Sequence, residues 1–349
     1  MPESILKNGA TTAIGSVPFE DAGEAVGFIL NCGIDVPCWP QLPVRGFMEG
    51  MIPQCSEGLP FIKIDEKEKR AWCEIPEDRS EALTDFYQKI IDMDVEAFAI
   101  SERAAAGLYR FIEAIRESGR KQPCLKGQVT GPVTMSLGLA DQNKQALFHD
   151  VEMRDVVVNI IAAKARWQAR LLGRHCEKPL IFLDEPVMAG FGTSAYLSLK
   201  AEHVKEMCNT CIAAVHEEGA LAGVHCCSNT DWGMMMSADF DVLNFEAMDS
   251  ACAISLYPDA ARNFINRGGA LAWGVVPTTS AIDDASEESV VARLREEFDR
   301  MEAKGFTRAE LKRSCVLTPS CGAGGLNVDQ CRKVFDLLTR LQARFHREF

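Results

Sequence analysis

A repeated alternation of short apolar runs with longer segments of helical periodicity constrains the fold of this chain most strongly. Eight strand candidates begin near residues 11, 34, 124, 179, 221, 242, 271 and 315, and helical patterns separate most of them. The run at 179–184, PLIFLD, is almost entirely apolar, as expected of a strand that is covered on both faces. Eight β-then-α units predict the α/β class, as a single (β/α)8 TIM barrel over residues 1–349.

One long segment interrupts this pattern after the second strand candidate. Residues 40–77 contain closely spaced prolines and glycines, which prevent a long regular element. Within them, residues 61–64 and 70–74 flank the charged turn DEKEK and predict a small hairpin. An insertion of this length at the end of a barrel strand is a candidate lid.

Composition and charge narrow the class of partner. No apolar run approaches the ~20 residues that a membrane helix needs, and the first residues show no signal-peptide pattern, which predicts a cytoplasmic protein. The formal charge of -13, with scattered basic residues, disfavours nucleic acid and favours a small-molecule substrate. The 14 cysteines are then expected to stay reduced and mostly buried. The C-x-x-C pair Cys208 and Cys211 lies on an apolar helical stripe and predicts core packing.

Polar side chains stand at the carboxyl ends of many strand candidates. They are Ser16, Thr130, Asp184, His225, Cys227, Glu246, Thr278 and Cys321. In a TIM barrel these ends meet on one face, which carries the chemistry. The sequence therefore predicts one functional site on that face.

The stretch LAGVHCCSNTDW at 221–232 suggests a metal site. Alternation along a strand places His225 and Cys227 on one side, where both can bind one soft metal ion, and Cys226 on the other. An H-x-C pair alone is weak evidence in a cysteine-rich chain. Glu246 in VLNFEA and Cys321 in CVLTPSCG extend it to a His, Cys, Glu, Cys set.

These residues, together with four short motifs, resemble the catalytic C-terminal half of cobalamin-independent methionine synthase. The motifs are IGS at 14–16, KGQVTGPVT at 126–134, DEP at 184–186 and TPSCG at 318–322. That half is a TIM barrel related to uroporphyrinogen decarboxylase and to corrinoid-dependent methyltransferases. The resemblance extends from residue 14 to about residue 325. It implies zinc held by His225, Cys227, Glu246 and Cys321, and a homocysteine thiol as methyl acceptor.

The resemblance also implies how the acceptor is held. The backbone of Ile14, Gly15 and Ser16 is expected to bind the carboxylate of homocysteine, and Asp184 its ammonium group. Glu49, in FMEGM of the candidate lid, is a second ammonium partner.

Within the zinc set, Glu246 is the hardest ligand among soft ones. We expect it to yield when the substrate sulfur arrives, which gives it a catalytic role beside Asp184.

The methyl donor is suggested by two departures from the family. The N-terminal barrel of the full-length enzymes has no counterpart in these residues, which leaves room for a corrinoid carrier protein over the zinc. The full-length enzymes also have a histidine in the turn after the seventh strand that resembles a proton donor to departing folate. Residues 273–279, WGVVPTT, contain none. Because an amine leaving group needs that proton and cobalt does not, a methylcorrinoid, as methylcobalamin or on a carrier, is the expected donor rather than methylfolate.

Three alternatives stay open. The acceptor can be another thiol such as coenzyme M, whose sulfonate an acidic Asp184 would repel. A uroporphyrinogen-decarboxylase-like protein fits less well, because a zinc set has no purpose there. A non-catalytic zinc-binding barrel would keep the metal without turnover.

Overall fold

A curled parallel sheet lies at the centre of the computed structural model, which describes residue 6 and residues 8–248 and 253–349. Its seven strands follow the order β1-β9-β8-β7-β6-β5-β4. They are β1 (Ala10–Thr11), β4 (Gln122–Thr130), β5 (Cys176–Asp184), β6 (Leu221–Cys226), β7 (Val242–Glu246), β8 (Ala270–Val276) and β9 (Cys315–Pro319). Seven of the predicted strands are therefore confirmed, and their order is that of a TIM-like barrel.

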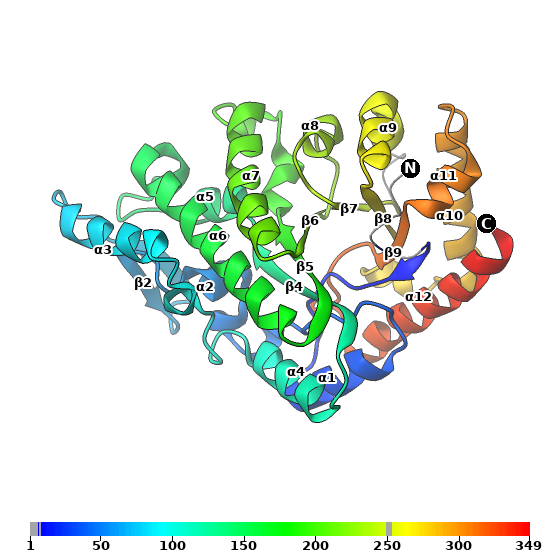
Figure 1. Ribbon diagram of the computed structural model, residues 1–349, viewed down its shortest axis with the longest axis horizontal. Helices are drawn as coiled ribbons and strands as arrows, with labels where there is room; N and C mark the ends of the chain where they lie inside the picture. The colour runs from blue at the N-terminus through cyan, green and yellow to red at the C-terminus, as the bar shows by residue number, and fades with distance from the viewer. Residues whose placement is uncertain (1–5, 7, 249–252) are drawn as a thin grey trace.

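Helices surround this sheet, as Figure 1 shows. They are α1 (Ala22–Asn31), α4 (Ala106–Glu117), α5 (Pro132–Gly138), α6 (Val151–Gly173), α7 (Ala201–Glu217), α8 (Trp232–Ser237), α9 (Pro258–Asn266), α10 (Glu287–Glu302), α11 (Arg308–Arg313) and α12 (Val328–Glu348). Helix α6 begins where the Asp150 side chain accepts hydrogen bonds from the amides of Glu152 and Met153. In the described part of the chain, every helix is too short or too polar to cross a bilayer.

The predicted strand at 34–39 is not a regular strand. Its residues still join the two edges of the sheet, through isolated bridges from Val36 to Thr12 and from Cys38 to Lys126. Two prolines explain the irregularity, since Pro37 and Pro40 have no N–H to donate to a ladder. The eighth position of the barrel is thus an irregular segment in place of the eighth strand.

The interior of the sheet supports this closure. One apolar cluster combines inward side chains from all seven strands with Val36 of the irregular segment. Its members are Leu6, Ala10, Val36, Cys124, Leu180, Phe182, Leu221, Val242, Ala270, Ala272 and Val316. A larger cluster fills the space between the sheet and the helices. The strands are therefore buried on both faces, which explains their nearly continuous apolar sequences.

Residues between the irregular segment and α4 form a lobe beside β4, at the left of Figure 1. It contains α2 (Met51–Ser56), α3 (Ser80–Ile91) and the antiparallel pair β2 (Ile62–Asp65) and β3 (Arg70–Cys73). The hydroxyl of Thr130, at the end of β4, donates to the Met51 carbonyl at 2.7 Å. This contact holds the start of α2 against the carboxyl end of the sheet. A lid function for the lobe stays a prediction.

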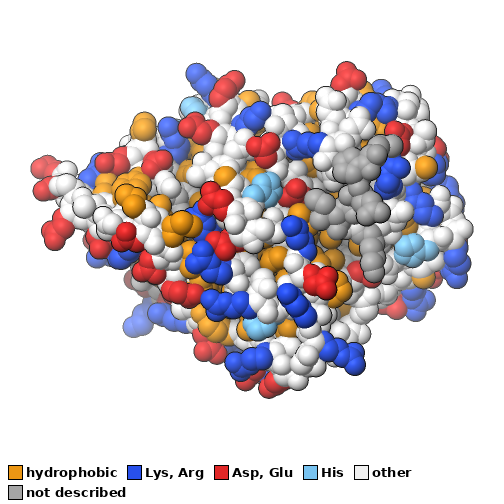
Figure 2. All heavy atoms as spheres, viewed as in Figure 1, with side chains coloured by type: hydrophobic (Ala, Val, Ile, Leu, Met, Phe, Trp, Pro, Cys, Tyr) orange, Lys and Arg blue, Asp and Glu red, His pale blue; other side chains and the backbone are white. Residues whose placement is uncertain are grey.

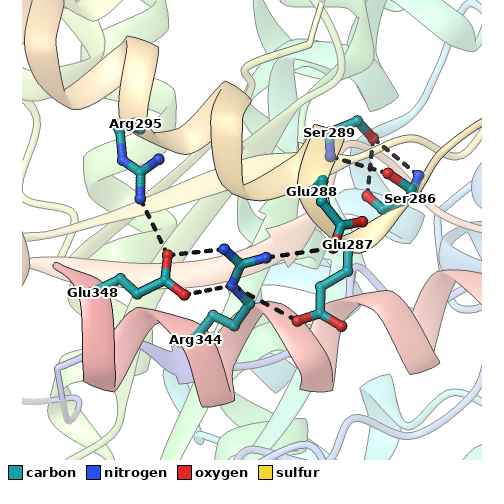
Figure 3. A network of polar contacts seen from close by, with 7 residues as sticks. All are labelled: Ser286, Glu287, Glu288, Ser289, Arg295, Arg344 and Glu348. Atoms are coloured by element: carbon teal, nitrogen blue, oxygen red, sulfur yellow. Dashed lines mark hydrogen bonds and ion pairs between the residues drawn. The ribbon is translucent and has the colours of Figure 1, made fainter.

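The last helix is tied to α10 by a network of ion pairs (Figure 3). Arg344 Nε lies 2.6 Å from Glu348 Oε1 on the same helix, and Arg295 of α10 lies 3.1 Å from Glu348 Oε2. Each such exposed pair contributes at most about 1 kcal/mol. Elsewhere on the face shown in Figure 2, acidic and basic side chains are interspersed.

Candidate metal centre

Three predicted ligands meet at the carboxyl ends of β6 and β9. His225 is the next-to-last residue of β6, Cys227 follows that strand, and Cys321 lies just beyond β9. His225 Nε2 is 3.0 Å from Cys227 Sγ and 3.5 Å from Cys321 Sγ, and the two sulfurs are 3.0 Å apart. Among the described residues, this is the only group of three or more His, Cys, Asp and Glu side chains close enough together to share a metal ion.

Strand alternation separates the ligands from their neighbour in sequence. His225 and Cys227 point to the inner side of the sheet, whereas the buried thiol of Cys226 contacts the Ser228 carbonyl at 3.4 Å. Cys226 packs in the cluster between the sheet and the helices, as the sequence predicts.

The three donor atoms have nearly the dimensions of one face of a tetrahedral zinc site. Zinc bonds of about 2.3 Å to sulfur and 2.0 Å to nitrogen would place two sulfurs about 3.8 Å apart, and nitrogen and sulfur about 3.5 Å apart. The distance of 3.5 Å from His225 to Cys321 matches, and the two distances of 3.0 Å to Cys227 are shorter, so the Cys227 thiol must move by less than an ångström. The residues therefore fit a zinc ion, with a fourth ligand to be supplied.

The electrostatics of the trio favour one thiolate. The pKa of Cys321 is lowered, because its sulfur shares a hydrogen bond with Cys227 and a second with His225. The pKa of Cys227 is raised correspondingly, by the same contact and by burial. Burial, the largest single effect, would lower the pKa of His225, but the hydrogen bonds to Cys321 and Asn244 and the charges of Cys321 and Asp184 together outweigh it and raise the pKa. A thiolate beside an imidazole is the donor set that a soft divalent metal requires.

The position of Cys321 depends on a close approach of β8. A β-bulge interrupts the β8–β9 register between Gly274 and Val276, and the Val276 carbonyl then accepts from the Ser320 amide at 2.8 Å. A Cβ at Gly274 would lie 2.9 Å from Ser320 Cα, so only glycine permits this approach. The Ser320 hydroxyl also accepts from the Thr278 amide at 3.2 Å. Bulges beside functional sites commonly redirect a side chain in this way.

Ser16 holds the same loop from the opposite side. Its carbonyl accepts from the Ala323 amide at 2.9 Å, and its hydroxyl accepts from the Gly324 amide at 3.3 Å. A Cβ at Gly322 would lie 2.1 Å from that hydroxyl oxygen. The predicted substrate-binding segment therefore also positions the loop that carries Cys321.

A cavity of about 180 Å³ opens beside the three ligands. It is lined by Ile14, Ser16, Gln41, Pro43, Glu49, Met51, Asp184, Pro186, His225, Cys227, Cys321 and Gly322. Sites for drug-sized ligands usually enclose about 300–1,000 Å³, so this one suits a smaller molecule, of the size of an amino acid. The structure thus brings most of the predicted substrate residues to one cavity with the metal-binding trio.

Asp184, at the end of β5, offers an unsatisfied acceptor to this cavity. Its Oδ1 is buried and has no hydrogen-bond partner among the described residues. Burial raises the pKa of Asp184 to about 6, although the charges of Lys126 and His225 act in the opposite direction. An unpaired buried carboxylate oxygen is costly unless a ligand with a donor group satisfies it.

Ile14 and Gly15 are held by the residues beneath them. The ammonium group of Lys126 is fully buried and donates to the Ile14 carbonyl at 2.6 Å and to Gln128 at 3.1 Å. Gly15 has φ +148°, and a Cβ there would lie 2.7 Å from the Gln128 amide nitrogen. Glycine is therefore required at this position.

Glu49 faces the same cavity but is already paired. Its Oε1 forms an ion pair with Arg45 Nε at 2.9 Å, although it has no hydrogen-bond partner among the described residues, and its Oε2 accepts from the Leu42 amide at 3.3 Å. Burial raises the pKa of Glu49 to about 7, against the opposing charge of Arg45. Its charge is thus less available to a ligand than that of Asp184.

Gln41 was missed by the sequence reasoning and adds another acceptor. The Gln54 amide nitrogen donates to the Ala104 carbonyl at 2.7 Å, so the Gln54 oxygen faces Gln41 and accepts from its nitrogen at 2.8 Å. The Gln41 oxygen is then the end left for other contacts. A polar residue within the proline-rich segment at 37–43 was the available signal.

The structure does not bring Glu246 into the trio. It is the last residue of β7, and its carboxylate accepts a hydrogen bond from the Met248 amide. By register, β7 pairs Phe245 with Cys226, so Glu246 stands one residue further on, beside Cys227. Alternation also places it on the same side of the sheet as Cys227. Its role as fourth ligand stays a prediction, which requires its carboxylate to leave the Met248 amide.

The two motifs KGQVTGPVT and DEP meet through Glu185. This fully buried carboxylate accepts from the Val133 amide at 2.9 Å and from the Thr134 amide at 2.7 Å, at the start of α5. A Cβ at Gly131 would lie 2.2 Å from the Glu185 carboxyl carbon. These residues have a structural role, since they lock β4, β5 and α5 together below the cavity.

Comparisons with known proteins add evidence on the fold. No family model matches the sequence, and no curated protein matches it. A B12-independent methionine synthase from Shewanella sp. W3-18-1, solved with selenomethionine, is similar with a TM-score of 0.61 and 16% identity, over 98% of this chain and 99% of that one.

Two further solved structures are similar over nearly their whole length. A methyltransferase from Methanosarcina mazei has a TM-score of 0.58 at 14% identity, over 99% of this chain and 95% of that one. A candidate vitamin-B12-independent methionine synthase from Listeria monocytogenes has a TM-score of 0.58 at 11% identity, over 98% of each chain. At these identities the comparisons show a shared fold.

Proposed function

We propose that this chain is a zinc-dependent methyltransferase that methylates the thiol of homocysteine to form methionine. The observation that carries the proposal is the convergence of His225, Cys227 and Cys321 on one wall of a small cavity that also contains the unpaired carboxylate of Asp184. The shared fold with methionine synthase and methyltransferase structures supports it.

The metal-binding residues prepare the acceptor sulfur. A bound zinc ion would lower the pKa of a coordinated thiol, so that the proton is lost to solvent; at its ordinary pKa of about 8.5 a thiol is mostly protonated and unreactive at neutral pH. His225, Cys227 and Cys321 would hold the ion, and Glu246 would complete the set. Two thiolates and a carboxylate give the site net negative charge, so the substrate sulfur retains its electron density. Glu246, the hardest ligand, is the one expected to yield to that sulfur.

The remaining cavity residues suit an amino acid. Asp184 offers a buried acceptor to the ammonium group, with Glu49 as a second and weaker partner. The backbone of Ile14 to Ser16 is the proposed partner of the carboxylate. Coenzyme M carries a sulfonate and no amine, so this acidic wall disfavours it. The selenomethionine bound to the Shewanella protein is an analogue of methionine, the proposed product, and supports methionine formation as the proposed reaction.

The turn after β8 suggests the methyl donor. Residues 273–279 contain no group that titrates near neutral pH, and the Thr278 hydroxyl is hydrogen-bonded to Ser320 at 3.1 Å. An amine leaving group such as tetrahydrofolate would depart unprotonated from this side, at a large cost in barrier. Cobalt accepts the electron pair without a proton. A methylcorrinoid, free or on a carrier protein, is therefore the proposed donor.

Methyl transfer by the purified, zinc-loaded protein tests the proposal. Four reactions pair each donor, methylcobalamin or methyltetrahydrofolate, with each acceptor, homocysteine or coenzyme M, and methylated thiol is measured by mass spectrometry. Methylcobalamin with homocysteine should give the highest rate. Equal rates with methylfolate, in a preparation free of corrinoid, would refute the donor. Zinc binding without turnover on any thiol would favour a non-catalytic zinc protein.

A further inference from the structure

Asn244 contacts the metal-binding histidine from the neighbouring strand. It lies on β7, directly opposite His225 in the β6–β7 register, and its side chain is fully buried. Its Oδ1 faces His225 Nδ1. Its Nδ2 donates to the Ala272 carbonyl on β8 at 3.1 Å and to the Thr318 hydroxyl on β9 at 2.6 Å.

These contacts determine which ring nitrogen of His225 carries the proton. A backbone carbonyl only accepts, so the end of Asn244 that faces Ala272 must be its NH₂ group. The oxygen of Asn244 then faces the ring, and because it too only accepts, His225 Nδ1 must be protonated. A neutral imidazole has a single N–H, which leaves the lone pair on Nε2. Nε2 is the atom that lies 3.0 and 3.5 Å from the two cysteine sulfurs.

We infer that Asn244 is a positioning residue of the metal site. It selects the Nδ1–H form of His225 and thereby presents the Nε2 lone pair to the metal. Its second bond, to Thr318, couples His225 to the strand that leads into Cys321. The inference rests on the metal-binding part of the proposed function and is independent of methyl transfer.

Two substitutions of Asn244 distinguish the effect of its accepting oxygen from the effect of its NH₂ group. Asn244→Leu and Asn244→Asp both remove the NH₂ donor, but only aspartate keeps an acceptor opposite Nδ1. Gln168→Leu is a matched control, because Gln168 is an equally buried amide that accepts from the Trp39 indole at 2.9 Å and donates to the Gln128 carbonyl at 2.8 Å, without touching the trio.

The experiment measures zinc affinity by competition with a chromophoric chelator, and the ligand-to-metal absorption of the cobalt-substituted protein. Asn244→Leu should bind zinc about 10–100-fold more weakly and alter the cobalt spectrum, as expected for the loss of a bond that orients a ligand. Asn244→Asp should retain at least about tenfold tighter binding than Asn244→Leu. Gln168→Leu should keep the wild-type affinity. Wild-type affinity in Asn244→Leu, equal losses in both variants, or an equal loss in Gln168→Leu would overturn the inference.

A second readout needs no variant to fold. Long-range ¹H–¹⁵N spectra of histidine-labelled, zinc-loaded protein should show the His225 proton on Nδ1, whereas a proton on Nε2 would overturn the inference. If the wild-type chain bound no zinc, both the proposed metal site and the inference about Asn244 would be wrong. If zinc bound but no methyl were transferred, only the proposed function would fail.

Discussion

Replacement of Asp184 by asparagine tests how the cavity recognises its ligand. The change is nearly isosteric and removes one negative charge at the end of β5. Oδ1 of Asp184 is buried and has no hydrogen-bond partner in the described part of the chain, so an ammonium group would form a charge-assisted hydrogen bond there. Such bonds contribute about 1.5–3 kcal/mol. Since 1.4 kcal/mol is tenfold in affinity, Asp184→Asn should weaken homocysteine binding about 10–150-fold.

The assay compares two thiols that differ only in the amine. Homocysteine and 4-mercaptobutanoate are titrated calorimetrically into zinc-loaded wild-type and Asp184→Asn protein. The substitution should reduce homocysteine affinity by the full factor and leave 4-mercaptobutanoate nearly unchanged, because that thiol has no ammonium group to lose. Equal losses with both thiols, or no loss with either, would refute the reasoning and return Asp184 to a structural role.

Glu49→Gln provides the matched control for charge. It removes a carboxylate from the same cavity, but one that already pairs with Arg45 at 2.9 Å. Its effect on homocysteine should therefore be smaller than that of Asp184→Asn. A larger effect would mean that Glu49 is the main ammonium partner. A disturbance of Lys126, whose charge acts on Asp184, would weaken both thiols alike and is thus separated from ligand recognition.

Further predictions concern the metal and the buried carboxylates. Cys227→Ser or Cys321→Ser should abolish stoichiometric zinc in metal analysis, and full occupancy in both would contradict the ligand assignment. Gly131→Ala should lower the free energy of unfolding by at least about 2 kcal/mol in denaturant titrations, because it displaces Glu185 from its hydrogen bonds, whereas Gly27→Ala, with nothing within 4 Å, should be neutral or stabilising. Burial raises the pKa of Glu185 from 4.5 to about 7, so the folded metal-free chain binds that proton more tightly than the unfolded chain. The free energy of unfolding of the metal-free chain should therefore fall as pH rises from about 4.5 to 7. The fall should be less steep in Glu185→Gln, and a steeper fall in that variant would contradict the raised pKa of Glu185.

The fold was largely predictable because the hydrophobic periodicity of the sequence indicates which side chains are buried. Seven strands covered on both faces appear as apolar runs, and segments of helical periodicity separate most of them. The strand predicted at 34–39 failed for a local reason. Pro37 and Pro40 remove two donors, so the chain meets its neighbours through isolated bridges. Apolar character alone did not reveal this loss of regular pairing.

The convergence of His225, Cys227 and Cys321 was predictable because a barrel brings the carboxyl ends of its strands together on one face. The contacts around these residues were not, because they depend on register and on loop paths. Asn244 pairs with His225 only when β6 and β7 align as they do. Lys126 appears in sequence as a charge inside a strand, which predicts burial at a cost without naming its partner at Ile14. Glu246 shows most clearly what sequence cannot predict. Strand alternation predicts the side of the sheet on which it lies, but not the hydrogen bond that its carboxylate accepts from the Met248 amide.

The loop after β9 links recognition of the substrate to the geometry of the metal. Ser16 uses its carbonyl and its hydroxyl to hold residues 323 and 324, while its segment is the proposed carboxylate site. On the other side of the loop, Ser320 is bound to Thr278 and Val276. The loop that carries Cys321 is therefore held on both sides by its neighbours, in addition to the contacts of the Cys321 sulfur with His225 and Cys227. A ligand bound at Ser16 would therefore act on the loop that also carries Cys321, so the proposed substrate site and the proposed metal site share one support.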